Sequence, residues 1–119
     1  MTTALIVDDS RLSRMMILSI LKETRPDWKT IEATNGEEAL QKAVDVDINV
    51  MILDYNMPGM DGITLGIELK NRYPNAFITL LTANIQDKIR MKAEESGLNF
   101  RKKPVTQDTI SAIAEQSGQ

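Results

Sequence analysis

The chain contains neither cysteine nor histidine among its 119 residues. Without cysteine, disulfide bonds and thiolate chemistry are excluded. Without histidine, the commonest general base, Ser-His triads and histidine-ligated metal sites are excluded as well. A metal ion bound by this chain must therefore be a hard cation held by oxygen atoms, such as Mg²⁺ or Mn²⁺.

Long apolar runs and strong charge are also lacking. No run approaches the ~20 apolar residues of a membrane-spanning helix, and the start Met1-Thr2-Thr3 does not open a signal peptide. We therefore expect no membrane insertion and, by default, a cytoplasmic location. The net charge of -3 provides no excess of Lys and Arg for direct nucleic-acid binding. With 42% apolar and 26% charged residues, the composition is typical of one packed domain over residues 1–119.

Short apolar runs alternate with longer segments of helical period. Continuously apolar runs are typical of strands buried on both faces of a parallel sheet, whereas the second and fifth runs are short or alternating and suit edge positions. Five strand–helix units predict an α/β, doubly wound parallel sheet with helices on both faces. The expected strands are Thr3–Val7, Thr30–Ala33, Val50–Leu53, Phe77–Leu81 and Leu98–Lys102, and the expected helices are about Ser10–Thr24, Gly36–Val44, Gly62–Arg72, Ile85–Ser96 and Thr106–Gln116.

Several residues mark the helix boundaries. Ser10, Asn35 and Thr106 can act as N-caps. Gly97 stands where a helix C-terminus needs a left-handed residue. Asp61-Gly62 is typical of a turn that leads into a helix, without a catalytic part.

Charged and hydroxyl side chains follow the predicted strands at their carboxyl ends. These residues are Asp8, Asp9, Asp54, Thr82 and Lys103. In open parallel sheets, ligands bind outside this edge. Three carboxylates gathered there repel one another by roughly 3 kcal/mol per pair at ~5 Å and an effective dielectric of ~20. A bound cation and a chemical task would explain why the chain tolerates this repulsion.

These residues are suited to phosphoryl transfer. A carboxylate can attack phosphorus to give an aspartyl phosphate, and a metal ion and a cation stabilise the charge in the transition state. Asp54, alone at the end of the central strand, is the expected nucleophile. Asp8 and Asp9 would hold the metal, Lys103 would supply the fixed positive charge, and Thr82 one hydrogen bond. Since the chain lacks histidine, a phosphoryl group could arrive from a histidine on another protein.

The pattern resembles the response-regulator receiver domains of two-component signalling, including single-domain chemotaxis-type regulators. The resemblance covers nearly all of the chain and rests on Asp8-Asp9, on Leu53-Asp54-Tyr55-Asn56-Met57-Pro58-Gly59-Met60-Asp61-Gly62, on Leu81-Thr82-Ala83 and on Lys103-Pro104. It implies a flavodoxin-like fold with strand order 2-1-3-4-5. It further implies that Asp54 accepts phosphate from a sensor histidine kinase or a histidine phosphotransfer protein, and that a downstream protein target reads the result.

The resemblance also implies roles for individual residues. Asp9 and Asp54 would bind Mg²⁺ through their carboxylates, Asn56 through its backbone carbonyl, and Asp8 mainly through water. Thr82 and Phe100 would form a coupled switch, although the family often has Tyr where Phe100 stands. The Lys103-Pro104 peptide bond would be cis.

Two surfaces are candidates for partner binding. In the first helix, Met16, Ile17, Ile20 and Leu21 are expected to face the sheet. Met15 and Leu18 would then face outward, either as ordinary scattered apolar residues or as a docking surface for a histidine-bearing helical bundle, where adaptable Met is useful. The second surface comprises Ile85, Lys88, Ile89, Phe100 and Lys102.

Two other functions share parts of this pattern. A small phosphohydrolase of the haloacid-dehalogenase type would need a second acid two residues after the nucleophile, and Asn56 stands there. A pseudo-receiver would bind partners without phosphorylation, but the complete set of acids, hydroxyl and lysine counts against it. We therefore expect a regulator that takes part in its own phosphorylation and dephosphorylation and is not otherwise an enzyme.

Overall fold

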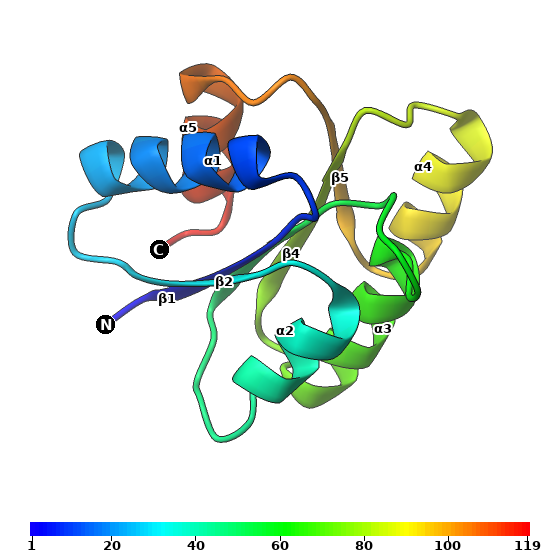
Figure 1. Ribbon diagram of the computed structural model, residues 1–119, viewed down its shortest axis with the longest axis horizontal. Coiled ribbons are helices and arrows are strands. Elements are labelled where there is room, and N and C mark those ends of the chain that lie inside the picture. Colours follow the sequence, from blue (N-terminus) through cyan, green and yellow to red (C-terminus); the bar gives the residue numbers. More distant parts are fainter.

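The computed structural model describes residues 1–119 as five strands that alternate with five helices (Figure 1). The strands are β1 (Thr3–Val7), β2 (Lys29–Ala33), β3 (Val50–Leu53), β4 (Phe77–Thr82) and β5 (Asn99–Lys102). The helices are α1 (Arg11–Thr24), α2 (Gly36–Lys42), α3 (Gly62–Arg72), α4 (Asp87–Glu95) and α5 (Gln107–Gln116). Every expected element is present, and the boundaries differ from the predicted ones by no more than two residues.

The strands form one parallel sheet in the order β2-β1-β3-β4-β5, which confirms the predicted fold class and order. The central strands β1 and β3 are buried throughout, whereas the edge strands β2 and β5 are largely exposed or half-buried. This difference explains their sequences, because only a strand covered on both faces needs apolar residues at every position.

Helices cover both faces of the sheet (Figure 1). On one face, α1 and α5 contribute Ile17, Leu21, Ile110 and Ile113 to a core that includes Ile6 and Ile52 of the sheet. On the other face, α2, α3 and α4 pack against a second core that includes Leu5, Leu53 and Leu80. Alternate residues of each strand pack into the two cores, because successive side chains of a strand point to opposite faces of the sheet. The ends of the strands lie between the two helix layers, where polar side chains can be exposed.

The helix ends match the predicted boundary residues. The side chains of Ser10, Asn35 and Thr106 cap α1, α2 and α5, each accepting a hydrogen bond from a backbone N–H three residues later. Asp61 does the same for α3, which confirms the prediction that Asp61-Gly62 opens a helix. Gly97 follows α4 with a φ of 80°, in the left-handed region.

The apolar face of α1 differs from the prediction. Ile17 and Leu21 are buried, but Met16 is 40% exposed, and Leu18 is partly buried against the core that it was expected to face away from. Because successive residues turn by about 100° around a helix, Leu18 lies closer to the Ile17–Leu21 line than Met16 does. The sequence alone did not show whether the residues on the Met16 side or on the Leu18 side of Ile17 and Leu21 would pack against the sheet.

None of the helices is long and apolar enough to cross a membrane.

Candidate functional site

The register of the sheet brings the predicted site residues to one edge. Val7 of β1 is paired with Leu53 of β3, so Asp8 and Asp54 leave the sheet side by side. Thr82 ends β4 beside β5, and its carbonyl oxygen accepts a hydrogen bond from the Lys103 backbone N–H at 2.9 Å. Five residues from four segments of the chain therefore meet at the carboxyl edge, where ligands bind in folds of this kind.

The ammonium group of Lys103 lies among the oxygens of this edge. Its Nζ is 2.9 Å from Asp8 Oδ2, 3.8 Å from Asp54 Oδ2 and 3.3 Å from Ser13 Oγ. Asp8 and Lys103 form a hydrogen-bonded ion pair, whereas the distance to Asp54 is too long for a hydrogen bond. The pair is largely shielded from solvent, because the Asp8 and Lys103 side chains are 3% and 17% exposed.

The carboxylate oxygens have unequal partners. Asp8 uses both of its oxygens, since Oδ1 accepts the Ser10 backbone N–H at 2.9 Å and Oδ2 accepts from Lys103. Asp54 Oδ1 accepts the Tyr55 backbone N–H at 2.9 Å, which leaves Oδ2 facing the pocket. Asp9 is exposed. The free acceptors at this edge are therefore on Asp9 and on one side of Asp54.

The acidic cluster has the composition of a hard-cation site. Asp8, Asp9 and Asp54 each offer a carboxylate oxygen, and these three atoms lie within 4.8 Å of one another. All the donors are oxygens, as Mg²⁺ and similar ions prefer. The cluster therefore fits a divalent cation.

Asp54 is electrostatically strained. Burial and, after it, the neighbouring Asp8 carboxylate raise the pKa of Asp54 from 3.8 to about 6, against the opposing effects of Lys103, the Tyr55 N–H and the Thr82 hydroxyl. Its charged form is thus poorly solvated, and any cation that enters the pocket will be attracted to it.

The remaining predicted residues lie around this centre at different depths. Thr82 is fully buried, and its hydroxyl accepts the Asn84 backbone N–H at 3.1 Å. Asn56 is exposed in the loop after β3. Phe100 is half-buried on β5 and packs against neither core. The Lys103-Pro104 peptide bond is cis, as the resemblance implied.

A glycine fixes the backbone behind Asp54. A Cβ atom on Gly62, the first residue of α3, would lie 2.0 Å from the Asp54 carbonyl oxygen and 2.8 Å from Leu80 Cδ1. The Gly62 N–H also donates to the Tyr55 carbonyl oxygen at 3.0 Å. The start of α3 is therefore packed directly against the residue that carries the central carboxylate.

We predict that Gly62→Ala lowers the free energy of unfolding by about 1–3 kcal/mol, because backbone atoms must move to admit the new methyl group. Urea denaturation measures the change. Gly36→Ala is the matched control, since Gly36 also opens a helix but its Cβ would meet only the flexible Met60 side chain, at 3.0 Å. Equal stability losses in the two variants would contradict the close packing of α3 against Asp54.

Two side chains that support the site were not among the predicted residues. Arg14 donates to the Asp8 carbonyl oxygen at 2.8 Å and to Glu32 Oε1 at 3.0 Å, so it ties the Asp8 turn to β2. Ser13 contacts Lys103. Both lie in the first turn of α1. Their nearness to the acidic pair in the sequence is the only indication of a role at the site, and it does not show which face of the helix points to the pocket.

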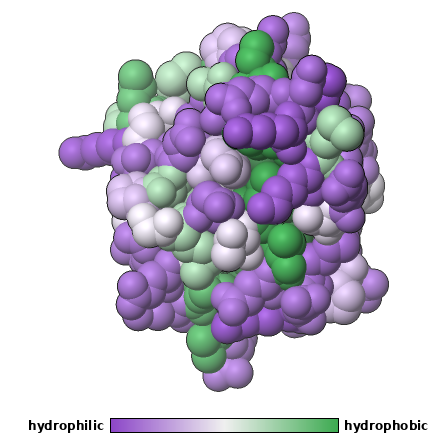
Figure 2. All heavy atoms as spheres, turned by 90° about the vertical axis from the view of Figure 1, so that its right-hand side faces the viewer, coloured by the Kyte–Doolittle hydropathy of each residue, from purple (hydrophilic) through white to green (hydrophobic).

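The predicted partner surfaces are only partly exposed. Met15 is 55% and Ile85 59% exposed, and Lys88 and Lys102 are exposed as well. Ile89 is 5% exposed and belongs to the core, so its assignment to a surface was wrong. It lies on the face of α4 that packs on the sheet, a face that the sequence of this short helix does not define. Figure 2 looks onto the side of the molecule to which the strands point, where hydrophilic atoms dominate and hydrophobic patches are small.

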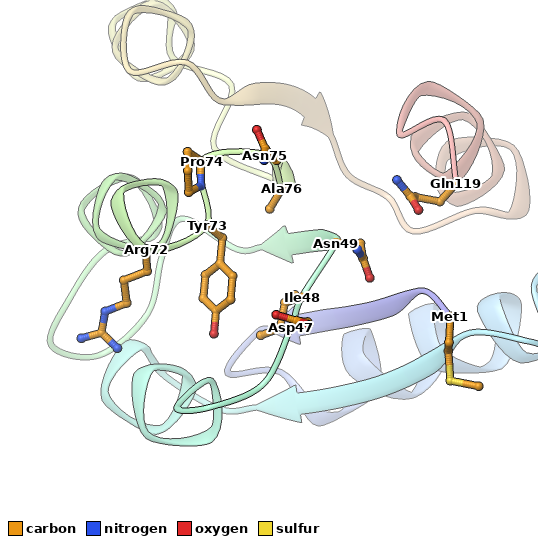
Figure 3. A pocket seen from close by; sticks show the side chains of 10 residues that line it. All are labelled: Met1, Asp47, Ile48, Asn49, Arg72, Tyr73, Pro74, Asn75, Ala76 and Gln119. Atoms are coloured by element: carbon orange, nitrogen blue, oxygen red, sulfur yellow. The ribbon is translucent and has the colours of Figure 1, made fainter.

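A separate cavity of about 360 Å³ lies at the opposite end of the sheet (Figure 3). Its lining includes Asn49 and Ala76, which immediately precede β3 and β4, together with Met1 and Gln119 from the two chain ends. None of the predicted site residues contributes to it. The chemistry suggested by the sequence therefore belongs to the carboxyl edge and not to this cavity.

Fold and site together define a doubly wound α/β domain with a metal-competent acidic pocket and a partly buried lysine at the carboxyl edge of its sheet. The chain belongs to the response regulator receiver domain family, whose sequence pattern matches residues 4–115. It is a receiver domain of the chemotaxis-regulator type, a signalling module of two-component systems.

Individual relatives support this assignment. The chain is similar to chemotaxis protein CheY of Listeria monocytogenes, with 32% identity over 119 residues that cover 98% of both chains. It is also similar to a chain of the CheX-CheY-BeF3-Mg+2 complex from Borrelia burgdorferi, with a TM-score of 0.87 and 26% identity over 99% of this chain and 90% of that one.

Longer proteins also match. Protein-glutamate methylesterase/protein-glutamine glutaminase 1 of Methanosarcina acetivorans is 44% identical over 79 residues, which are 66% of this chain and 22% of the relative. The chain spans between 22% and 28% of the length of this protein and three further relatives. The similarity to them concerns the receiver part alone.

Proposed function

We propose that residues 1–119 form one receiver domain in which Asp54 accepts a phosphoryl group from a phosphohistidine on another protein, with Mg²⁺ as the cofactor. The observation that carries this proposal is the arrangement of Lys103 Nζ 3.8 Å from Asp54 Oδ2, beside carboxylate oxygens that lie within 4.8 Å of one another. A nucleophile, a metal-competent acid cluster and a fixed cation are the groups that phosphoryl transfer to a carboxylate requires.

The chain's own residues have distinct parts in the proposed reaction. Asp54 Oδ2 forms the new bond to phosphorus while the bond from phosphorus to the histidine nitrogen of the donor breaks. The donor ring carries a proton on its other nitrogen, so it takes the electron pair of the broken bond and leaves as neutral imidazole. Asp54 Oδ1 stays fixed on the Tyr55 N–H. Lys103 faces the incoming phosphoryl oxygens and offsets their negative charge. The Thr82 hydroxyl, buried at the end of β4, would donate a hydrogen bond to the group once it is attached.

Asp9 and Asp54 would hold Mg²⁺ directly, with the backbone carbonyl of Asn56, and Asp8 would act mainly through water. This division agrees with the finding that both Asp8 oxygens already have protein partners. The ion, when bound, neutralises charge on the phosphoryl oxygens during transfer. Mn²⁺ has the same preference for oxygen ligands and is the expected substitute.

Incubation of the purified protein with Mg²⁺ and acetyl phosphate or phosphoramidate should add about 80 Da, the mass of one HPO₃ group on a carboxylate. Intact-mass spectrometry detects the adduct, which should be absent in Asp54→Asn and present in Asp61→Asn, where the lost carboxylate only caps α3. If no donor gives an adduct on the natural chain, the domain is a pseudo-receiver that binds partners without phosphorylation.

The first helix is the proposed docking surface for the phosphodonor. Leu12, Met15 and Met16 are 67%, 55% and 40% exposed and lie in the first two turns of α1, which begins two residues after the acidic pair. Leu18 contributes less than the sequence suggested, since it is partly buried. A sensor histidine kinase or a histidine phosphotransfer protein would bring its histidine to Asp54 by covering this helix.

Met15→Glu should therefore slow phosphotransfer from the protein donor by about tenfold or more, the effect of losing one well-placed apolar interface contact, while phosphorylation by acetyl phosphate stays unchanged. Stopped-flow or radiolabel transfer assays give both rates. Met91→Glu is the control, because Met91 is equally exposed, at 56%, but lies on α4. A Met15→Glu protein that receives phosphate from its kinase at the natural rate would remove α1 from the docking surface.

The proposed output surface comprises Ile85 in the loop before α4, Lys88 of α4, and Phe100 and Lys102 of β5. Thr82 and Phe100 would couple it to the pocket, with the half-buried ring turning inward as the Thr82 hydroxyl moves to the phosphoryl group. A downstream protein target would bind the changed surface. The chain would catalyse its own phosphorylation and dephosphorylation and no other reaction, as Asn56 supplies no second acid for a phosphohydrolase.

A further inference from the structure

The ammonium group of Lys103 has a second anchor besides Asp8. Its three N–H donors face Asp8 Oδ2 at 2.9 Å, Ser13 Oγ at 3.3 Å and Asp54 Oδ2 at 3.8 Å. Only the first two contacts are short enough to be hydrogen bonds. The position of Lys103 relative to Asp54 is therefore set from the side of β1 and α1, by one carboxylate and one hydroxyl.

The Ser13 hydroxyl is free to contact Lys103 because another side chain already accepts the hydrogen bond of the N-cap N–H. It is the third residue of α1, after the N-cap Ser10, where a helix often places Glu or Gln to bind the backbone N–H of the N-cap. Here the Ser10 N–H donates to Asp8 Oδ1 at 2.9 Å instead. The backbone N–H of Ser13 is satisfied by the Ser10 side chain at 3.2 Å, so its hydroxyl can turn toward Lys103.

The neutral hydroxyl also suits the charge balance of the pocket. The first turn of α1 contains no acidic residue, although acids are favoured at helix N-termini. A carboxylate at position 13 would compete with Asp54 and the phosphoryl group for the single ammonium of Lys103. A serine oxygen accepts a hydrogen bond from Lys103 without adding a further negative charge.

We propose that Ser13 is a positioning residue that holds Lys103 Nζ at the mouth of the pocket, ready for the phosphoryl group. With Asp8 as its only anchor, the ammonium would move with the Asp8 carboxylate whenever that side chain shifts within the acid cluster. Ser13 keeps Lys103 in place from a helix that carries no other part of the acid cluster. This inference rests on the proposed phosphorylation of Asp54 for its effect on rate, but the contact itself exists without it.

The test compares Ser13→Ala, Ser13→Thr and the control Ser19→Ala, an exposed serine of the same helix. Self-phosphorylation by acetyl phosphate should be about tenfold slower in Ser13→Ala, the effect expected for one lost hydrogen bond to a charged group. Ser13→Thr, which keeps the hydroxyl, should recover most of the rate. Ser19→Ala should behave as the natural chain, and urea unfolding midpoints of both alanine variants should agree.

A second readout is independent of phosphorylation. The ¹⁵Nζ signal of the Lys103 ammonium, recorded by NMR without donor or metal, should show faster hydrogen exchange in Ser13→Ala and natural exchange in Ser13→Thr and Ser19→Ala. An unchanged Lys103 signal in Ser13→Ala overturns the positioning role, whatever the rate. A natural chain that gives no Asp54 adduct, but in which the Lys103 signal responds to Ser13→Ala, refutes the proposed function and leaves the contact standing.

Discussion

Lys103→Met should lower the free energy of unfolding by about 3 kcal/mol in metal-free buffer, because removing one partner of a buried ion pair leaves the other uncompensated. Asp8 would lose its only cationic partner, and Asp54 would lose the charge that opposes the rise of its pKa. The same variant should be phosphorylated by acetyl phosphate about a hundredfold more slowly or worse, as when one charge-stabilising group is removed from an active site.

Urea denaturation in EDTA and intact-mass time courses measure the two effects. Lys102→Met is the matched control, since Lys102 is the preceding residue but is exposed and forms no ion pair. Added Mg²⁺ should restore part of the stability of Lys103→Met, because it supplies positive charge to the same oxygens. A Lys103→Met protein as stable in EDTA as the natural chain would show that the ion pair with Asp8 makes no net contribution.

Asp54→Asn should have the opposite effect on stability and raise the free energy of unfolding at neutral pH by about 2–3 kcal/mol. The increase of the Asp54 pKa from 3.8 to about 6 corresponds to roughly 3 kcal/mol at 1.36 kcal/mol per unit. The folded chain binds this proton more tightly than the unfolded chain does. The stabilisation is therefore complete below about pH 4 and is lost as the pH rises through 6.

The two proteins should consequently have similar stability near pH 4 and diverge between pH 4 and pH 7, which denaturation curves at a series of pH values will show. Mg²⁺ should raise the stability of the natural chain by mass action and raise that of Asp54→Asn much less. Asp27→Asn, at an exposed position before β2, controls for the change in net charge. If the free energies of unfolding of the two proteins differed by the same amount at every pH in this range, the pKa of Asp54 would not be raised by folding.

The sequence predicted the strands and their ends well because burial on both faces leaves a clear signal. Val50–Leu53 is apolar at every position, and Asp54 follows at once, so both the strand and the placement of its acid could be inferred. The helix faces were less predictable. Met16, Leu18 and Ile89 were assigned to the wrong surroundings because an apolar side chain near the edge of a helix stripe can pack or remain exposed, and only the neighbouring elements decide.

The finer parts of the site were also beyond the sequence. The sequence does not indicate that Asp8 accepts the hydrogen bond of the Ser10 N–H, so that Ser13 is not needed for it. This hydrogen bond depends on the path of the β1–α1 turn. The contact between Gly62 and the Asp54 carbonyl oxygen likewise depends on how α3 approaches the sheet. Residue types at strand ends give the chemistry of the pocket, and the turns set its geometry.

The contact between Lys103 and Asp8 joins residues 95 positions apart in the sequence. Contacts of such separation form late, because a large loop must close before they are gained. A chain still emerging from the ribosome, or one cut before its last strand, would display three mutually repelling carboxylates and no ammonium to balance them. Under the proposed function, such a chain would lack the cation that offsets the charge of the incoming phosphoryl group, so it would not be phosphorylated efficiently until the last strand has joined the sheet.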